Sequence, residues 1–113
     1  MDQEERQFLQ TAAWLFSRHG QRNRARAVCE ALAEEDRRDG TAAAALAELL
    51  LDDGEAARAL EVLRGAEFPR QLEHAQAVME TRALRLLGRE REAMDRWRRY
   101  MEARKGGARQ WVA

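Results

Sequence analysis

Side chains that could act as a base or a nucleophile are few in this chain of 113 residues. Two histidines, His19 and His74, and one cysteine, Cys29, are present. A catalytic base needs a partner group that positions it, and each histidine falls at a predicted turn or helix start. We therefore expect both histidines to be exposed, and we expect a protein that is not an enzyme.

Cys29 and the glycines also predict structure rather than chemistry. Cys29 occupies an apolar position, which favours a small buried residue over a reactive thiolate. A lone cysteine excludes a disulfide framework and a multi-cysteine zinc site. The glycines do not form a phosphate-binding loop motif. We expect no metal and no cofactor.

The charge balance argues against nucleic-acid binding. Lys plus Arg equals Asp plus Glu, at 20 each, whereas nucleic-acid binders carry a basic excess. The run from Arg89 to Lys105 mixes seven basic with four acidic residues, many at i,i+3 or i,i+4. This pattern favours a solvated, ion-paired helix face.

Hydropathy predicts a cytoplasmic protein without direct membrane insertion. No apolar run approaches the ~18 residues of a membrane span. The first six residues, Met1 to Arg6, are rich in charge and lack the apolar core of a secretory signal.

Composition predicts an all-α fold. Alanine occurs 22 times and leucine 13 times, whereas Val, Ile and Thr together occur seven times and isoleucine is absent. Strands favour β-branched residues, and alanine and leucine favour helices. A chain of this length fits one domain.

The chain repeats with a period of 34 residues. Gly20, Gly54 and Gly88 are separated by this interval twice. We call positions related by the period a column. Four more columns keep similar residues: small ones at Ala13, Ala47 and Thr81; large ones at Phe16, Leu50 and Leu84; alanine at Ala25, Ala59 and Ala93; bulkier apolar ones at Cys29, Leu63 and Trp97.

This pattern resembles the tetratricopeptide repeat (TPR), a helix–turn–helix unit of 34 residues. The resemblance implies three units, 6–39, 40–73 and 74–107, stacked as a short right-handed solenoid, with a C-terminal tail at 108–113. The glycines would lie in equivalent turns. Two features depart from the pattern: the terminal proline is missing at Arg37 and Gln71, and Glu80 replaces a customary leucine.

Six helices are expected. Thr41 is the predicted N-cap of the third, and Gly106-Gly107 is predicted to release the tail. The expected spans are 3–18, 22–35, 41–51, 55–64, a fifth that follows an irregular 65–69 segment and ends at Leu87, and 90 to about 104.

Repeat geometry predicts a concave groove lined by the first helix of each unit. Such a groove suits a peptide or an amphipathic helix. Trp14 is the foremost candidate contact, although it could instead pack against a neighbouring helix. The predicted lining is Gln7, Gln10, Trp14, Ser17 and Arg18; Thr41, Ala44, Glu48, Leu51 and Asp52; and Ala75, Val78, Arg82, Arg85 and Leu86.

Short motifs in the first and third units resemble the YscY family, which are small TPR chaperones of bacterial type III secretion. They are Gln7-Phe8-Leu9, Trp14-Leu15, Gly20, Arg24-Ala25 and Ala31-Leu32, then Arg82-Ala83, Gly88, Glu92-Ala93 and Tyr100-Met101.

The resemblance implies a function without catalysis. Family members bind a small secreted protein of the YscX type as a heteromer and keep it competent for export. The pair is also thought to engage the inner-membrane export gate. Two alternatives stay open: a generic TPR interaction scaffold, and the related chaperones of translocator proteins, which are usually longer.

Overall fold

The computed structural model describes the backbone of residues 1–112 and the side chains of residues 1–106. These residues form helices joined by short connections, and the part described contains no strand, so the all-α prediction is confirmed. The elements are α1 (Gln3–Arg18), α2 (Arg22–Glu35), α3 (Gly40–Asp52), α4 (Ala56–Gly65), the short 3-10 segment η1 (Arg70–Leu72), α5 (Glu73–Leu86) and α6 (Glu90–Val112).

Three turns with the same geometry join the helices in pairs. Gly20, Gly54 and Gly88 all adopt positive φ, between 75° and 78°, a conformation that glycine reaches without a Cβ penalty. The residue after each glycine donates its backbone N–H to a carbonyl five residues earlier, in each case at 2.8 Å. This is the Schellman motif, which satisfies the last carbonyls of a helix. The predicted equivalence of the three glycines is confirmed.

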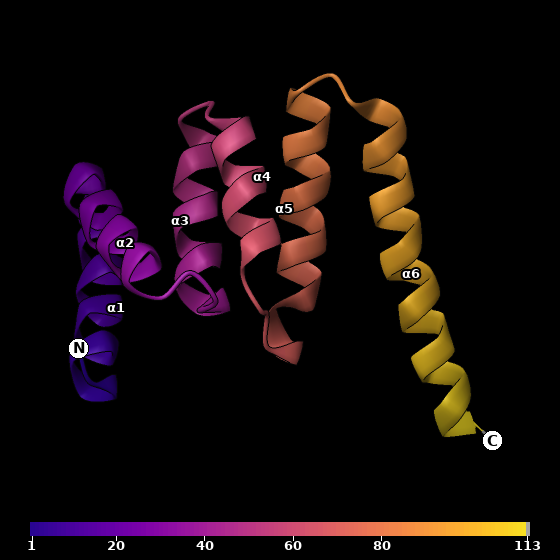
Figure 1. Cartoon of the computed structure of the whole chain (residues 1–113), viewed down its shortest axis with the longest axis horizontal. Coiled ribbons are helices and arrows are strands. Elements are labelled where there is room, and N and C mark those ends of the chain that lie inside the picture. Colours follow the sequence, from indigo (N-terminus) through magenta and orange to yellow (C-terminus); the bar gives the residue numbers. More distant parts are fainter. Residues whose placement is uncertain (113) are drawn as a thin grey trace.

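The paired helices form a row of three hairpins (Figure 1). Helix α1 packs on α2, α3 on α4, and α5 on α6. The hairpins are joined through contacts of α2 with α3 and of α4 with α5, and α3 also contacts α5. The α1–α2 hairpin lies at one end of the row and α6 at the other.

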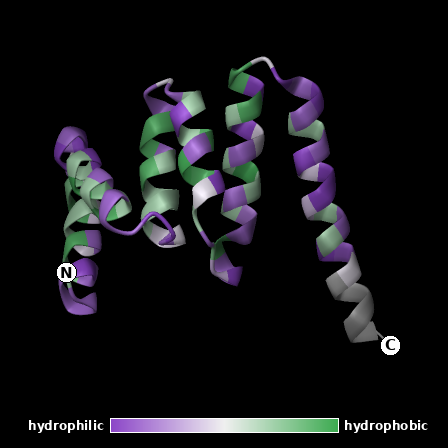
Figure 2. Ribbon diagram, in the orientation of Figure 1, coloured by the Kyte–Doolittle hydropathy of each residue, from purple (hydrophilic) through white to green (hydrophobic). Residues whose placement is uncertain are grey.

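The apolar core is concentrated in the middle hairpin. Helix α3 is the most hydrophobic helix in Figure 2, whereas α6 is mostly hydrophilic. Leu46, Leu50 and Leu63 are almost fully buried there. The small columns serve close approach of the helices: the most exposed member among Ala13, Ala47, Thr81, Ala25, Ala59 and Ala93 is Thr81, at 7%.

The helix ends differ from expectation at two places. Asp39, not Thr41, caps α3, because its carboxylate accepts the backbone N–H groups of Thr41 and Ala42. Helix α6 continues through Gly106-Gly107 to Val112, so its predicted end near Arg104 is wrong. Gly106 lacks the positive φ of the three turn glycines, and a glycine in helical conformation costs only about 1 kcal/mol. The side chains of the predicted tail, 108–113, lie outside the described residues.

Gly40 permits the α4–α5 connection to cross the start of α3. A Cβ at this position would lie 2.5 Å from the carbonyl oxygen of Glu67 and 2.8 Å from the Cα of Phe68. The Glu67 N–H donates to the carbonyl of Arg38 at 2.9 Å beside this contact. Only glycine allows the two backbones to come this close.

Glu80, which departs from the repeat pattern, is buried in an ion pair. The Arg96 side chain on α6 donates Nε–H to its carboxylate at 2.5 Å. One period earlier, the same two columns hold Leu46 and Val62. The third hairpin therefore has a charged pair where the second has an apolar one.

Candidate partner-binding groove

A groove lies between the first and second hairpins, with a volume of about 310 Å³. Its residues come from three helices: Gln10, Ala13, Trp14 and Ser17 of α1; Arg22, Ala25, Cys29 and Leu32 of α2; and Thr41, Ala42, Ala45, Glu48, Leu49 and Asp52 of α3.

Small buried side chains account for the depth of the groove. Ala13, Ala25, Cys29 and Ala42 line it and are each at most 6% exposed. Larger residues at these positions would fill the space between the helices. The lining therefore combines an apolar interior with polar side chains from α1 and α3, as is typical of sites that bind peptides.

Trp14 is the exposed large apolar side chain at the groove, whereas Leu32 and Leu49, which also line it, are buried. Trp14 is 57% exposed, so it is not a core residue packed against a neighbouring helix. The Arg18 guanidinium lies 5.0 Å from the centre of its ring, a cation–π contact that holds the indole in place. An aromatic ring left this exposed is a natural anchor for a partner.

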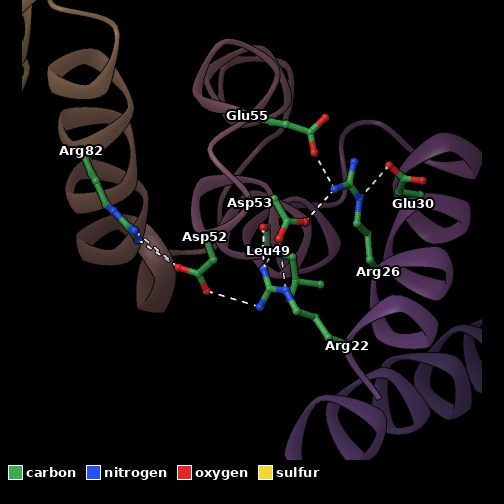
Figure 3. Close-up of polar contacts among 8 residues, drawn as sticks. All are labelled: Arg22, Arg26, Glu30, Leu49, Asp52, Asp53, Glu55 and Arg82. Atoms are coloured by element: carbon green, nitrogen blue, oxygen red, sulfur yellow. Dashed lines mark hydrogen bonds and ion pairs between the residues drawn. The ribbon is translucent and has the colours of Figure 1, made fainter. Parts of the chain in front are cut away.

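A network of ion pairs links the hairpins beside the groove (Figure 3). Arg22 of α2 reaches Asp53 at 3.0 Å and donates to the Leu49 carbonyl at 2.8 Å. It also lies 3.6 Å from Asp52, which Arg82 of α5 approaches at 3.4 Å. Residues from all three hairpins are thus joined through one carboxylate.

Arg26 extends the network from α2 to the α3–α4 turn. It contacts Asp53 at 2.7 Å and also pairs with Glu55 and Glu30. Hydrogen bonding to Glu55 and Asp53 raises the pKa of Arg26. Hydrogen bonds from Arg26 and Arg22 lower the pKa of Asp53. These shared charges hold the walls of the groove in register.

Most of the residues predicted to line the groove are at the surface, but only some of them line it. Six predicted positions line the groove: Gln10, Trp14, Ser17, Thr41, Glu48 and Asp52. Others are exposed outside it, namely Gln7, Arg18, Val78, Arg82, Arg85 and Leu86, whereas Ala44 and Ala75 are half-buried.

Leu51 is a correction, because it is 2% exposed and belongs to the hydrophobic core. The equivalent positions in its column, Ser17 and Arg85, are exposed. A residue of the middle hairpin has neighbouring hairpins on both sides, so the same column is covered there. Leu51 cannot contact a partner.

The contribution of α2 was missed by the prediction. Arg22, Ala25, Cys29 and Leu32 line the groove, whereas repeat geometry assigned the lining to the first helix of each unit. The available signal was the clustering of small residues at Ala13, Ala25 and Cys29, which predicts space between helices as well as close packing.

The remaining reactive side chains are Cys29, His19 and His74. Burial raises the pKa of the Cys29 thiol, which keeps it protonated at neutral pH. His19 and His74 are exposed as predicted. The His74 ring lies 3.2 Å, Nδ1 to hydroxyl oxygen, from Tyr100, and its centre is 6.0 Å from that of Trp97.

Within the residues that the structure describes, no group of three His, Cys, Asp or Glu side chains is placed to hold a metal. None of the helices in this part of the chain has the length and apolar character to span a bilayer. Comparison with family models, curated proteins and solved structures finds no match. The repeat and the groove are therefore the features from which function can be inferred.

Proposed function

We propose that this chain is a TPR-type protein in which units 6–39, 40–73 and 74–107 stack as a short right-handed solenoid. The three Schellman turns at 34-residue intervals support this proposal. So do the small columns, whose members are buried in every hairpin. The departure at Glu80 fits the same architecture, because Arg96 neutralises it within the hairpin.

We further propose that the chain is a cytoplasmic chaperone of bacterial type III secretion. Its partner would be a small YscX-like secreted protein, held as a heteromer, and the complex would meet the inner-membrane export gate. The observation that carries this proposal is the exposed Trp14 ring beside an apolar groove floored by small side chains. The YscY-like motifs in the first and third units are the reason for proposing a YscX-like protein as the partner.

The mechanism is the shielding of an apolar helix face. A large side chain of the partner would enter the space above Ala13, Ala25 and Cys29 and would cover part of Trp14. Burying apolar surface contributes about 25 cal/mol per Å² before the costs of association are subtracted. A partner helix held this way cannot aggregate through the same face.

Polar side chains around the groove would orient the partner. Gln10 and Ser17 of α1 and Glu48 of α3 are polar residues that line the groove. The ion pairs of Arg22 and Asp52 keep α2 and α3 in fixed positions before the partner arrives, and such preorganisation lowers the entropy cost of binding.

Co-expression with a YscX-like protein tests the function. We expect the wild-type chain to co-purify with it as a complex whose mass light scattering can measure. Trp14→Ala should weaken binding at least about tenfold, as for a truncated anchor. Met94→Ala is the matched control, because Met94 is 52% exposed on α6, far from the groove. Equal binding by the two folded variants would contradict the assignment of the groove.

A further inference from the structure

Helix α1 carries a second apolar surface, separate from the groove. Phe8 is 73% exposed and Leu15 is 43% exposed. They lie seven residues apart, which places them on one face of the helix. We call Phe8 and Leu15 the α1 stripe. Neither of these residues lines the groove, which uses Gln10, Ala13, Trp14 and Ser17 of the same helix.

The opposite end of the row has a different outer surface. The exposed face of α6 is mainly charged and contains Arg91, Asp95, Arg98, Arg99 and Glu102. A terminal helix of a stacked array needs a polar outer face to remain soluble. Among the described residues of α6, Met94 is the exposed large hydrophobic side chain, whereas α1, at the other end (Figure 1), exposes the α1 stripe. Of the two terminal helices, α1 therefore has the larger apolar surface for a partner to cover.

The residues around the α1 stripe are arranged to fit a second copy of themselves. Two copies of α1 placed antiparallel would set Phe8 of one against Leu15 of the other. The crossing point falls at Thr11 and Ala12, whose small side chains allow close approach. The match is mutual, as a two-fold axis requires.

Charge adds to this match. The first turn of α1 is acidic at Glu4 and Glu5, and its last turn is basic at Arg18, which the C-cap residue His19 follows. Antiparallel pairing brings the acidic turn of each copy to the basic end of the other. Among the described residues, none of these four side chains forms an ion pair within the chain. We propose that the α1 stripe is the interface of a homodimer with antiparallel α1 helices.

The dimer would leave the groove open. Trp14 lies about 120° around α1 from Phe8, because six residues separate them at about 100° each. Arg18 can contribute both to the groove and to the dimer interface, because its guanidinium lies on the Trp14 ring and the residue is at the end of α1. The interface thus goes beyond the proposed chaperone function and does not depend on it.

Size sets the expected strength. Helix α1 has 16 residues, about 24 Å at 1.5 Å per residue, so one helix pair buries less than the ~1,600 Å² of a stable interface. We therefore expect a weak dimer with a dissociation constant of about 10–100 µM.

Sedimentation equilibrium of the full chain over about 5 to 300 µM, bracketing that constant, tests the proposal. The wild type should pass from monomer to dimer across this range. Phe8→Glu should raise the dissociation constant at least about tenfold, because it brings a charge into the apolar contact. Met94→Glu, at a similarly exposed apolar residue of α6, should leave it unchanged. Circular dichroism should show that both variants are folded.

Charge reversal distinguishes the antiparallel arrangement from other contacts. Glu4→Arg should weaken the dimer about threefold or more by facing Arg18 of the other copy. The double variant Glu4→Arg with Arg18→Glu should recover most of this loss. A wild type that stays monomeric, a dimer indifferent to Phe8→Glu, or a double variant no better than the single one would overturn the proposal. If the wild type stays monomeric, the α1 stripe would be available to bind a different protein.

Discussion

The middle hairpin and its two neighbours use the same sequence columns in different ways. Leu51 is buried, whereas Ser17 and Arg85, one period to either side, are exposed. The helical periodicity is the same in all three. What differs is the presence of packed hairpins on both sides of α3. Position in the row therefore decides whether a column is core or surface.

The two ends also differ from each other. In the columns that hold Leu46 and Val62 in the middle hairpin, the first hairpin has Ala12 and Val28 and the third has Glu80 and Arg96. The first end carries Trp14 and the α1 stripe, whereas the third end has a buried ion pair inside and a mainly charged α6 face outside. The surfaces that we propose for binding both lie at the N-terminal end.

The largest expected effect follows from the burial of Leu51. Leu51→Lys would remove an apolar side chain and leave an ammonium without a partner in the core, and we expect a loss of about 3–5 kcal/mol in unfolding free energy. Chemical denaturation measures this loss. Ser17→Lys, in the same column but exposed, should change stability by less than about 0.5 kcal/mol. Equal losses of unfolding free energy in the two variants would contradict the claim that this column is buried in the middle hairpin and exposed in the first one.

The Glu80–Arg96 pair is expected to have the next largest effect. Arg96→Val leaves the Glu80 carboxylate buried without its cation, which we expect to cost about 3 kcal/mol. Glu80→Leu with Arg96→Val introduces residues close to those of the middle hairpin and should restore wild-type stability or exceed it. A double variant as unstable as the single one, by thermal or chemical unfolding, would show that these columns are not interchangeable.

The junction between the first two hairpins predicts a smaller, pH-dependent effect. Burial tends to raise the pKa of Asp39, but hydrogen bonding to Arg6 and to backbone N–H groups outweighs it and the pKa is lowered. This carboxylate therefore stabilises the fold above its unfolded pKa of about 3.9, and the contribution is lost as the pH falls through the lower folded pKa.

Asp39→Asn keeps the N-cap but removes the charge, so we expect a loss of about 1–2 kcal/mol at pH 7. The difference from the wild type should shrink as the pH falls below about 4. Asp2→Asn is the matched control, since the Asp2 carboxylate caps α1 through the N–H of Glu5 and forms no ion pair with an arginine among the described residues. A difference that stays constant from pH 7 to the acid limit would argue against the ionic contribution.

Much of the fold could be predicted because the repeat is explicit. The three glycines mark turns that the backbone confirms, and the bounds of α1 and α2 were predicted to the residue. Local signals determine these features: a positive φ requires glycine, and small residues at fixed spacing require close helices.

The predictions were wrong where contacts between residues far apart in the sequence determine the structure. Asp39 rather than Thr41 caps α3, in part because Arg6, 33 residues away, holds its carboxylate. Leu51 is covered by neighbouring hairpins, and α2 reaches the groove because α1 and α3 leave room above Ala25 and Cys29. Such effects depend on how the hairpins pack against one another, and the 34-residue repeat of the sequence does not determine this packing.

The proposed function depends most on the groove as the binding site, and a side chain that fills the groove tests this dependence. Ala45 is exposed and lines the groove, whereas Ala57 is exposed on α4 outside it. Ala45→Arg should weaken binding of a YscX-like partner at least about tenfold, or 1.4 kcal/mol, in a titration followed by calorimetry, with helicity unchanged. Ala57→Arg should bind as the wild type does. Equal affinity of the two variants would contradict the central claim that a partner occupies the space between the first and second hairpins.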